Sequence, residues 1–578
     1  MLGLSLNEKK WVEVPFDGQK KDYIVNKYSM SQILAQSLAS KEIDIDEIPH
    51  FLEPTIKHFL PDPDHLLDMH KATKGLAEHV KNKGKIGILA DFDVDGATSA
   101  AIFIRFFKAL GVECVVHIPD RMKEGYGPNL EALESLYEKG AGIILVLDCG
   151  TTNTLLFEQF SACPVIVIDH HVAQSVLPPV FALVNPNRLD ETSPHKTLCT
   201  AGLAFLTIVS LNRELRNLGF YQGKKEPGLM DFLDLVALGT VCDMMVLTGL
   251  NRAFVAAGLK VLNKGQNLGL QVLKDFIGIK NDITAYHLGF MIGPRINAGG
   301  RIGESNLGVR LLTTGDGEDA LAIGAHLDYL NGQRQALEKK MLEDAFFMAE
   351  KKEENSVLVI ASHTFHQGVI GIVAGRLKER FHKPTIVISL GEDGKGKGSA
   401  RSVSGLNIGA LFHKAADLGV ILGGGGHGAA AGCSLMEDQI QGFEAFLLSE
   451  YKGGDTAPEL SYAATISIHS ATQELCGEID ALAPFGMGNP TPKFRLLRCY
   501  IAWRDRVSGG HLKLSLKGDR GELLSAMAFR TEGTPLEKLF SLPFETPLEF
   551  LGTLQLDTFF PGNPKVKFII EDARICGL

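Results

Sequence analysis

The chain has 578 residues, of which 45% are hydrophobic and 22% are charged, a composition typical of folded rather than disordered proteins. A net charge of -10 argues against binding nucleic acid over the whole surface. No uncharged apolar run approaches the ~20 residues that cross a bilayer, so we expect a soluble, cytoplasmic protein that does not bind membranes. The nine cysteines include no CxxC pair, which argues against a zinc site and a disulfide framework.

From Lys85 onward, short apolar runs alternate with helical stretches. KIGILA leads into ATSAAIFIRFFKAL, ECVVHI leads into a polar turn and a helix, GIILVL ends at Asp148 and PVIVI ends at Asp169. This alternation is typical of βαβ units, with a parallel sheet covered on both faces. The acidic residues therefore follow the carboxyl ends of three predicted strands, and in open α/β sheets that edge binds ligands.

The rest of the chain predicts further parts. Residues 316–352 form a long charged helical pattern that is typical of a connecting helix, although a surface helix within one domain would look the same. A second α/β pattern runs from SVLVIASH to LGGGGHGAAAG, and after YKGGDTAPEL short strands indicate a small β-barrel or sandwich. We therefore expect an N-terminal segment 1–80 without assignable chemistry, an α/β domain 81–315, a connecting helix 316–354, a second α/β domain 355–452 and a β domain 460–578.

Three aspartates, Asp91, Asp93 and Asp95, crowd the first of these strand ends. The pattern D-x-D-x-D-G also begins an EF-hand loop, but the twelfth position, where calcium needs a glutamate, is Ile102. Solvated aspartates that cap the following helix are an alternative, although one carboxylate would be enough for a cap. Three crowded carboxylates repel one another unless a cation compensates them, which favours a metal site.

Other acidic and imidazole side chains are predicted at the same edge of the sheet. His170 and His171 follow Asp169, while Asp148 and Asp243 each end an apolar segment. Each of these could be structural when taken alone. Together they form a carboxylate and imidazole set that suits Mn²⁺, Mg²⁺ or Fe²⁺. A two-metal site for in-line attack on phosphate is its natural use, on phosphoanhydrides or phosphodiesters.

Polar residues among glycines could hold the remainder of a phosphate substrate. The alternative for each is a tight turn with an exposed base. The candidates are Arg121, Lys123 and Tyr126 in IPDRMKEGYGPN; Arg295, Asn297 and Arg301 in GPRINAGGRIG; Lys395, Lys397, Ser399 and Arg401 in GKGKGSARS; and His427 in GGGGHGAAAG.

At this point the sequence resembles the DHH phosphoesterase superfamily and, more narrowly, the RecJ family of bacterial single-strand-specific exonucleases. The motifs occur in the family's order and cover residues ~85 to ~515, most of the chain. Phe92 stands where the family usually has Tyr, and Phe365 where it often has Trp, and neither change removes a ligand. The stretches are DFDVDGATSA, VLDCG, VIDHH, LGTVCD, GPRINAGGR, FHQGVIGIVAGRL, GSARS, GGGGHGAAAG and PFGMGNPTPKF.

The resemblance implies a parallel-sheet DHH domain, a long helix, a DHHA1 domain and a C-terminal oligonucleotide-binding (OB) fold. It implies digestion of single-stranded DNA to 5′-mononucleotides from the 5′ end, in repair and recombination, with two Mn²⁺ or Mg²⁺ ions. A monomer is expected, and a single-strand binding protein and a RecQ-type helicase are implied as partners. Residue spacing alone does not show the polarity.

The family's motifs also imply roles for individual residues. Asp95, His170 and His171 are expected to be catalytic, with His171 next to the scissile phosphate. Arg295, Arg401 and His427 match positions that hold substrate phosphates, to which we add Arg121, Tyr126, Asn297, Arg301 and Ser399 from the glycine-rich segments. The positions that match metal ligands are Asp91, Asp93, Asp95, Asp148, His170 and Asp243.

A basic segment near the C-terminus agrees with strand binding. Residues 493–520 contain eight basic and two acidic side chains, and Phe494, Tyr500 and Trp503 lie among them. An OB fold binds single strands with an electropositive groove and stacking aromatics, which this composition favours. Two other functions stay open: a phosphodiesterase for short oligonucleotides or cyclic dinucleotides, against which the extra β domain argues, and a non-catalytic scaffold, against which the complete ligand set argues.

Overall fold

The structure is a computed structural model, and it describes residues 5–121, 123–454, 458–557 and 564–576. The chain divides into two compact units, each of which is described by itself. One contains Pro61–Met245 and Gly258–Asp455. The other contains Met1–Leu60, Val246–Ala257 and Thr456–Leu578. Within the described residues, no helix is both long and apolar enough to cross a membrane.

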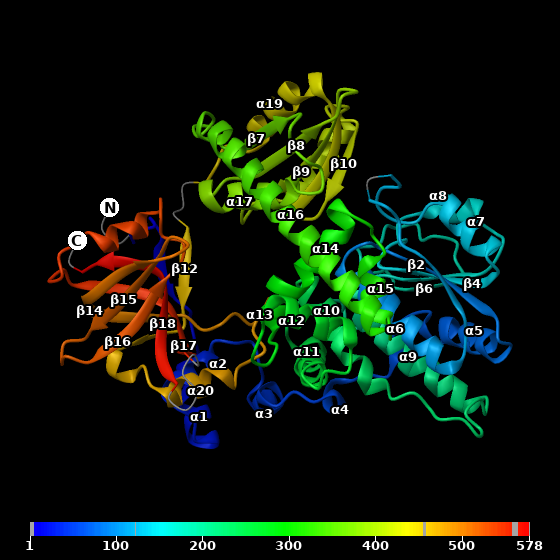
Figure 1. Cartoon of the computed structure of the whole chain (residues 1–578), viewed down its shortest axis with the longest axis horizontal. Coiled ribbons are helices and arrows are strands. Elements are labelled where there is room, and N and C mark those ends of the chain that lie inside the picture. The colour runs from blue at the N-terminus through cyan, green and yellow to red at the C-terminus, as the bar shows by residue number, and fades with distance from the viewer. Residues whose placement is uncertain (1–4, 122, 455–457, 558–563, 577–578) are drawn as a thin grey trace. The chain divides into compact units, whose positions relative to one another are not determined.

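The first α/β layer is a five-stranded sheet in the order β3-β2-β4-β5-β6, and every pairing in it is parallel. Its central strands are almost wholly buried, which explains the near-continuous apolar runs. Helices cover it (Figure 1), and the predicted parallel-sheet α/β fold is confirmed. The strands are β2 (Lys85–Ala90), β3 (Cys114–His117), β4 (Ala141–Leu147), β5 (Val165–Ile168) and β6 (Ala182–Val184); the helices are α5 (Met69–Lys81), α6 (Val94–Leu110), α7 (Leu130–Glu138), α8 (Thr154–Gln159) and α9 (Thr200–Asn217).

A helical region follows the sheet. Its first helix, α10 (Leu233–Cys242), corrects our expectation that the apolar segment before Asp243 belongs to the sheet. A short apolar run does not distinguish a buried strand from a buried helix, and in α10 the residues from Leu233 to Thr240 are all buried, Asp234 included. The region continues with α11 (Gly249–Leu262), α12 (Leu268–Ile277), α13 (Ala285–His287), the π-helical turn η4 (Leu288–Ile292), α14 (Gly293–Ile302), α15 (Leu307–Thr313) and the 34-residue α16 (Gly317–Glu350).

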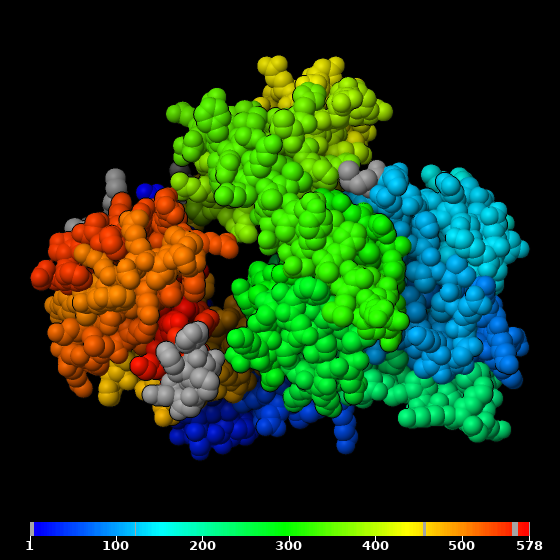
Figure 2. Space-filling view, viewed as in Figure 1, coloured from blue at the N-terminus to red at the C-terminus, as the bar shows by residue number. Residues whose placement is uncertain are grey.

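The second α/β layer follows α16 and has the strand order β10-β11-β9-β8-β7. Only β7 and β8 pair in parallel, and the glycine run is the edge strand β10. In the space-filling view, the green surface of α16 runs into the yellow-green surface of this layer (Figure 2). The elements are β7 (Leu358–Ser362), α17 (Ile370–Phe381), β8 (Thr385–Leu390), β9 (Lys395–Arg401), α18 (Ile408–Asp417), β10 (Gly423–Gly426), β11 (Ala430–Met436) and α19 (Ile440–Glu450).

The other unit contains a six-stranded sheet in the order β13-β14-β15-β16-β18-β17, in which pairing of β14 with β17 closes five strands into a barrel and β13 pairs with β14 alone. This confirms the predicted C-terminal β-barrel. Phe494, which we expected among the stacking aromatics, is fully buried in its core, so that expectation is wrong. The strands are β13 (Ala464–Ile466), β14 (Phe494–Val507), β15 (His511–Lys517), β16 (Leu523–Ala528), β17 (Leu548–Asp557) and β18 (Lys565–Ile575), with α20 (Gln473–Asp480) after β13.

Residues 5–60 of the expected N-terminal segment pack on this barrel, whereas residues 61–80 belong to the other unit. Strand β1 (Lys10–Glu13) pairs in parallel with β12 (Glu459–Tyr462), and Trp11 Nε1 donates a hydrogen bond to buried Asp572 Oδ2 at 2.9 Å. Helices α1 (Gly18–Tyr28), α2 (Gln32–Ala39), α3 (Ile48–Leu52) and α4 (Ile56–Phe59) complete the segment. The first sixty residues therefore belong to the same compact unit as the last hundred and twenty.

Arg252 joins three segments of this unit, and its side chain is only 1% exposed. Its guanidinium donates hydrogen bonds to the carbonyl oxygens of Phe51, Leu482, Ala483 and Pro484, and it lies 3.8 Å over the Phe51 ring. Because each of its nitrogens meets a carbonyl oxygen, this buried charge is compensated within the unit.

Candidate metal centre

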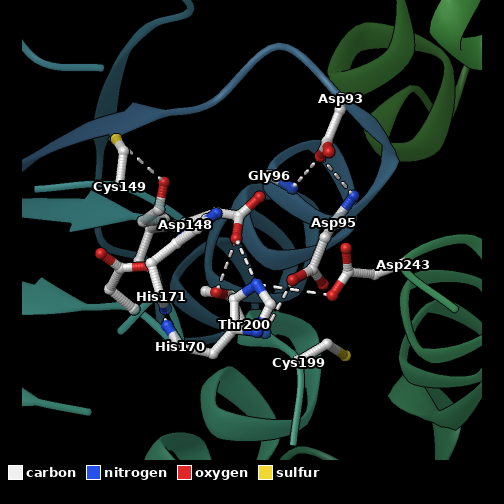
Figure 3. Close-up of polar contacts among 12 residues, drawn as sticks. Asp93, Asp95, Gly96, Asp148, Cys149, His170, His171, Cys199, Thr200 and Asp243 are labelled. Atoms are coloured by element: carbon white, nitrogen blue, oxygen red, sulfur yellow. Dashed lines mark hydrogen bonds and ion pairs between the residues drawn. The ribbon is translucent and has the colours of Figure 1, made fainter. Parts of the chain in front are cut away.

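The three clustered aspartates take different positions at the end of β2. Asp91 follows the strand and is buried, as is Asp95 in the first turn of α6. Asp93 caps the helix, because its Oδ1 accepts hydrogen bonds from the backbone N–H groups of Asp95 (2.8 Å) and Gly96 (3.1 Å), as Figure 3 shows. One aspartate therefore acts as the cap, while burial of the other two excludes solvated carboxylates.

Asp95 is held by the start of a second helix. Its two carboxylate oxygens accept hydrogen bonds from the backbone N–H groups of Thr200 (2.7 Å) and Ala201 (2.9 Å), the first residues of α9. The Thr200 hydroxyl donates to Asp148 Oδ1 at 2.9 Å. The helix N-terminus favours a negative charge here, and Thr200 fixes the distance between the two carboxylates.

His170 lies between aspartates from two other elements (Figure 3). Its Nε2 is 3.4 Å from Asp148 Oδ1 and 3.4 Å from Asp243 Oδ2. Asp148 follows β4 with a positive φ of 62°, and Asp243 caps the C-terminus of α10. All six side chains predicted as metal ligands are thus brought to one place.

Three overlapping groups of these side chains have ligand atoms within 4.8 Å of one another. Two of these groups share no residue and together contain all six predicted ligands, as two adjacent cations would need. The groups are Asp91, Asp93 and Asp148; Asp95, His170 and Asp243; and Asp148, His170 and His171.

The electrostatics of the cluster fit a bound cation. Burial and the charge of Asp93 raise the pKa of Asp91 well above its usual range, and burial with Asp95 does the same for the pKa of Asp148. Burial and Asp95 raise the pKa of Asp243 to about 9, and burial lowers the pKa of His170. Among the described residues, Asp91 Oδ1 and Asp243 Oδ2 are buried and accept no hydrogen bond. Oxygen and imidazole ligands of this kind suit Mn²⁺ or Mg²⁺.

His171 belongs to a hydrogen-bonded chain beside the cluster. Its Nδ1 is 2.7 Å from Asp169 Oδ1, and its Nε2 is 3.3 Å from the Tyr126 hydroxyl. Although burial opposes it, the hydrogen bond with Asp169 raises the pKa of His171 to about 9. Asp169 also accepts hydrogen bonds from the backbone N–H groups of His170, His171 and Thr151, so it orients this turn.

Comparison with known proteins agrees with the geometry. Residues 85–240 match the DHH family N-terminal domain, 354–453 the DHHA1 domain and 462–572 the RecJ OB domain. The single-stranded-DNA-specific exonuclease RecJ of Salmonella typhimurium is 32% identical over 545 residues, which cover 90% of this chain and 92% of that protein. The RecJ of Escherichia coli is 33% identical over 504 residues, 83% of this chain and 86% of that protein. The chain belongs to the RecJ family.

A solved RecJ structure shows the same architecture. The crystal structure of RecJ in complex with Mn²⁺ from Thermus thermophilus matches with a TM-score of 0.80 and 27% identity, covering 98% of this chain and 79% of that one. The RecJ complex with Mg²⁺ from the same organism matches with a TM-score of 0.74 and 25% identity, covering 98% of this chain and 78% of that one. Both relatives hold metals of the kind that this cluster fits.

Arginines from three elements gather beside this RecJ-family metal cluster. The Arg121 guanidinium lies 5.2 Å over the Phe92 ring, and Arg301 Nη1 donates a hydrogen bond to the carbonyl oxygen of Gly368 at 3.0 Å. Burial, together with the charges of Arg121 and Arg334, lowers the pKa of Arg301 to about 10. Burial and Arg121 also lower the pKa of Arg401. Such crowded guanidinium groups favour an anion, as a phosphate-binding site requires.

Most of the remaining residues predicted to bind substrate already have partners within the protein. Arg295 donates from Nε to Asp328 Oδ1 and from Nη1 to the Met291 carbonyl oxygen, both at 2.8 Å. Ser399 Oγ accepts a hydrogen bond from Arg401 Nη1 at 3.3 Å, so it orients that arginine. Asn297 is half-buried on α14, and His427 is exposed after β10. Lys123 pairs with Asp120, Lys395 with Asp393, and Lys397 donates to Ser434.

Sequence patterns missed three residues of this centre. Asp169 was noted only as a possible ligand, Thr200 lies in an unassigned segment, and Arg334 lies on the connecting helix. A carboxylate directly before the histidine pair is the one signal that could have suggested a role for Asp169 in orienting them. Thr200 and Arg334 come close to the site only through the tertiary fold, and their local sequence carries no comparable signal.

The basic segment of the barrel is partly neutralised in the structure. Lys493 pairs with Glu571, Arg495 with Glu549 and Arg506 with Glu537. Arg504 donates hydrogen bonds to two carbonyl oxygens. The excess of positive charge that we counted in the sequence is therefore smaller at the surface, although Trp503 remains 47% exposed on β14.

Proposed function

We propose that this chain is a metal-dependent exonuclease that hydrolyses single-stranded DNA from the 5′ end to 5′-mononucleotides, in DNA repair and recombination. The observation that carries the proposal is the six-ligand cluster, in which two buried carboxylate oxygens accept no hydrogen bond. It lies beside the hydrogen-bonded residues Asp169, His171 and Tyr126 and the crowded arginines. The names of the RecJ relatives supply the substrate class.

Two cations would be held by the two complementary groups. Asp91, Asp93 and Asp148 would hold one and Asp95, His170 and Asp243 the other. Bound there, divalent ions would supply positive charge at the attacking and leaving oxygens and would lower the pKa of water. The buried carboxylates, unable to ionise together without cations, would bind them strongly.

The other residues would act on the phosphate itself. His171 is held by Asp169 and would donate a hydrogen bond to an oxygen of the scissile phosphate, and Tyr126 limits rotation of its ring. Arg121, Arg301 and Arg401 would hold the phosphate groups of the terminal nucleotide, because the charge of Arg121 is close enough to lower the pKa of the other two and an anion would relieve that repulsion.

Digestion of a single strand labelled at one end tests the function. With Mn²⁺, we expect release of mononucleotides from a free 5′ terminus and none when that terminus is blocked. Release that starts at the 3′ end would contradict the polarity. Faster turnover of a dinucleotide than of a long strand would instead favour the short-oligonucleotide phosphodiesterase.

Several expectations stay predictions within this proposal. These are the monomeric state, the cytoplasmic location, and binding to a single-strand binding protein and a RecQ-type helicase. The domain boundaries drawn from the sequence and the roles of the individual site residues are predictions too, and the variants described below address the roles.

A further inference from the structure

Two aromatic rings stack on each other at the surface of the helix that leads to Arg301. Tyr286 and Phe290 have ring centroids 5.0 Å apart and an interplanar angle of 30°. Tyr286 is 62% exposed, and Phe290, at 71%, is the most exposed aromatic side chain in the described part of the chain. Single exposed apolar residues are ordinary, but a stacked and exposed pair presents a flat apolar surface that a ligand can cover.

The pair is fixed to the metal centre through the π-helical turn η4. The Cys242 thiol donates to the carbonyl oxygen of Leu288 at 3.4 Å, and Asp243 is the next residue along the chain. At Gly293 an added Cβ would lie 2.4 Å from Cys242 Sγ, so the helix presses closely on the end of α10. Isolated π-helical turns occur often at functional sites, and this one carries Phe290 beside the helix end that presents Asp243.

The turn η4 continues directly into α14, and the C-terminal end of this continuous helix lies on the other side of the metal centre. An added Cβ at Gly300 would lie 2.9 Å from the Phe92 carbonyl oxygen. Arg301 is close enough to Asp93 for the charge of Asp93 to act on its pKa, opposing the effect of burial. At 1.5 Å per residue, Phe290 and Arg301 are about 16 Å apart along this helix. A stacked strand rises about 3.4 Å per nucleotide, so that distance corresponds to roughly five nucleotides.

We propose that Tyr286 and Phe290 form a stacking platform for a base of the substrate strand, within about five nucleotides of the terminus held by the arginines. This inference rests on the proposed function and deepens it. Bases of every kind stack on aromatic faces, so the platform would hold the strand without reading its sequence. Lys274 lies close enough to His287 for its charge, after burial, to lower the pKa of that histidine, and it adds an attraction for the phosphate backbone.

The main test removes the rings and measures substrate affinity. For Tyr286→Ala/Phe290→Ala, we expect the KM for a 5′-phosphorylated single strand with Mn²⁺ to rise roughly 5- to 100-fold, the range expected for losing one stacked base. The rate at saturating DNA should stay near that of the wild type. Phe347→Ala is the matched control, because Phe347 is equally exposed, at 62%, on α16 of the same unit. An unchanged KM in the double variant would overturn the platform and leave a protein-docking surface as its replacement.

A second test locates the base. In the wild type, an abasic nucleotide at one position between the second and the sixth should raise the KM by a similar factor. In the double variant the same abasic position should have no further effect, because ring and base act together. Independent, multiplying effects of the two changes would contradict the platform even if the KM rises.

The two proposals fail in different ways. If the wild type releases no nucleotides with Mn²⁺, the proposed function fails. The platform is then still tested by the anisotropy of a fluorescent single strand without divalent metal. In that assay the double variant should bind more weakly than wild type and Phe347→Ala, and equal binding would overturn the platform. Tyr286→Phe should bind like the wild type, and equal thermal unfolding of all variants should show that they fold.

Discussion

The metal cluster and the surroundings of Arg252 are both buried and charged, but only one of them is complete. Arg252 meets four carbonyl oxygens and an aromatic ring, and those groups satisfy it. At the metal cluster, carboxylates face one another; among the described residues Asp91 Oδ1 has no hydrogen-bond donor, and Asp243 Oδ2 has only His170 Nε2 at 3.4 Å. A fold tolerates buried charge that is satisfied internally, whereas buried charge without enough partners indicates that a ligand completes it.

The largest effect is expected from neutralising one ligand of the incomplete cluster. Asp95→Asn keeps the shape of the side chain but removes the charge, so nucleotide release with Mn²⁺ should fall by about a thousandfold or more. Initial rates on a labelled single strand measure this. Asp231→Asn, an exposed aspartate of the same unit, should retain full activity. Activity of Asp95→Asn within tenfold of the wild type would remove Asp95 from the metal site.

Breaking the complete cluster should affect stability instead. Arg252→Met removes the side-chain donor to the carbonyl oxygens of Phe51 and Ala483 and leaves those of Leu482 and Pro484 with Asn489 Nδ2 alone, so it should lower the free energy of unfolding of that unit by about 3 kcal/mol. Urea unfolding followed by fluorescence measures the loss. Arg506→Met, which breaks an exposed ion pair in the same unit, should change it by less than about 1 kcal/mol. Similar losses in both variants would show that the carbonyl contacts of Arg252 contribute no more to the free energy of unfolding than an exposed ion pair.

Bound metal should complete the cluster, and the dependence of thermal stability on pH should therefore differ between the metal-free and the metal-bound protein. Without metal, folded Asp243 has a pKa of about 9 and keeps a proton that the unfolded chain releases near pH 4. Its stabilising contribution is therefore present at acidic pH and is lost as the pH rises toward 9. Asp243→Asn lacks this loss, so without metal its midpoint of thermal unfolding should exceed that of the wild type at pH 8 by roughly 2–8 °C, and by less at pH 5.

Adding Mn²⁺ sharpens the same measurement. Wild type should gain stability by binding the ion, and its midpoint at pH 8 should then exceed that of Asp243→Asn. If the midpoint of the metal-free wild type does not fall relative to the variant between pH 5 and pH 8, Asp243 is not held protonated in the folded state.

A smaller effect is expected at the edge of the incomplete cluster. Arg301→Lys keeps the charge but cannot both donate to the Gly368 carbonyl and present a second nitrogen to phosphate, so the KM for a 5′-phosphorylated strand should rise about tenfold. Steady-state kinetics measure it. Arg310→Lys, in an exposed pair with Asp319, is the matched control and should leave the KM unchanged. A lower rate at saturation with an unchanged KM would assign Arg301 to the interface with residue 368 alone.

Much of the site follows from local sequence. The apolar strand β2, the aspartates after it and the helix α6 are adjacent in the chain, so pattern and spacing predict their arrangement. The same holds for Asp148 after β4 and for the histidines after β5. Because parallel strands end at one edge, local elements are enough to place these residues together.

Other parts of the molecule depend on tertiary contacts that spacing does not contain. Asp243 arrives on a helix, since an apolar segment of ten residues suits a buried helix as well as a strand. The pairing of Arg252 with carbonyl oxygens more than two hundred residues away leaves no local pattern. The burial of Phe494 was likewise decided by closure of the barrel, which brings β14 against β17.

The pairing of β1 with β12 has a consequence for synthesis of the chain. The backbone N–H of Asn7 donates to Asp572 Oδ1, 565 positions later, so this contact cannot form until residue 572 has been synthesised. The intervening α/β unit has nearly all of its own partners once residue 455 has emerged, and it can fold first. Until the barrel strands have been synthesised, the apolar side chains of residues 5–60 lack their packing partners Leu482, Leu460, Tyr462 and Leu551.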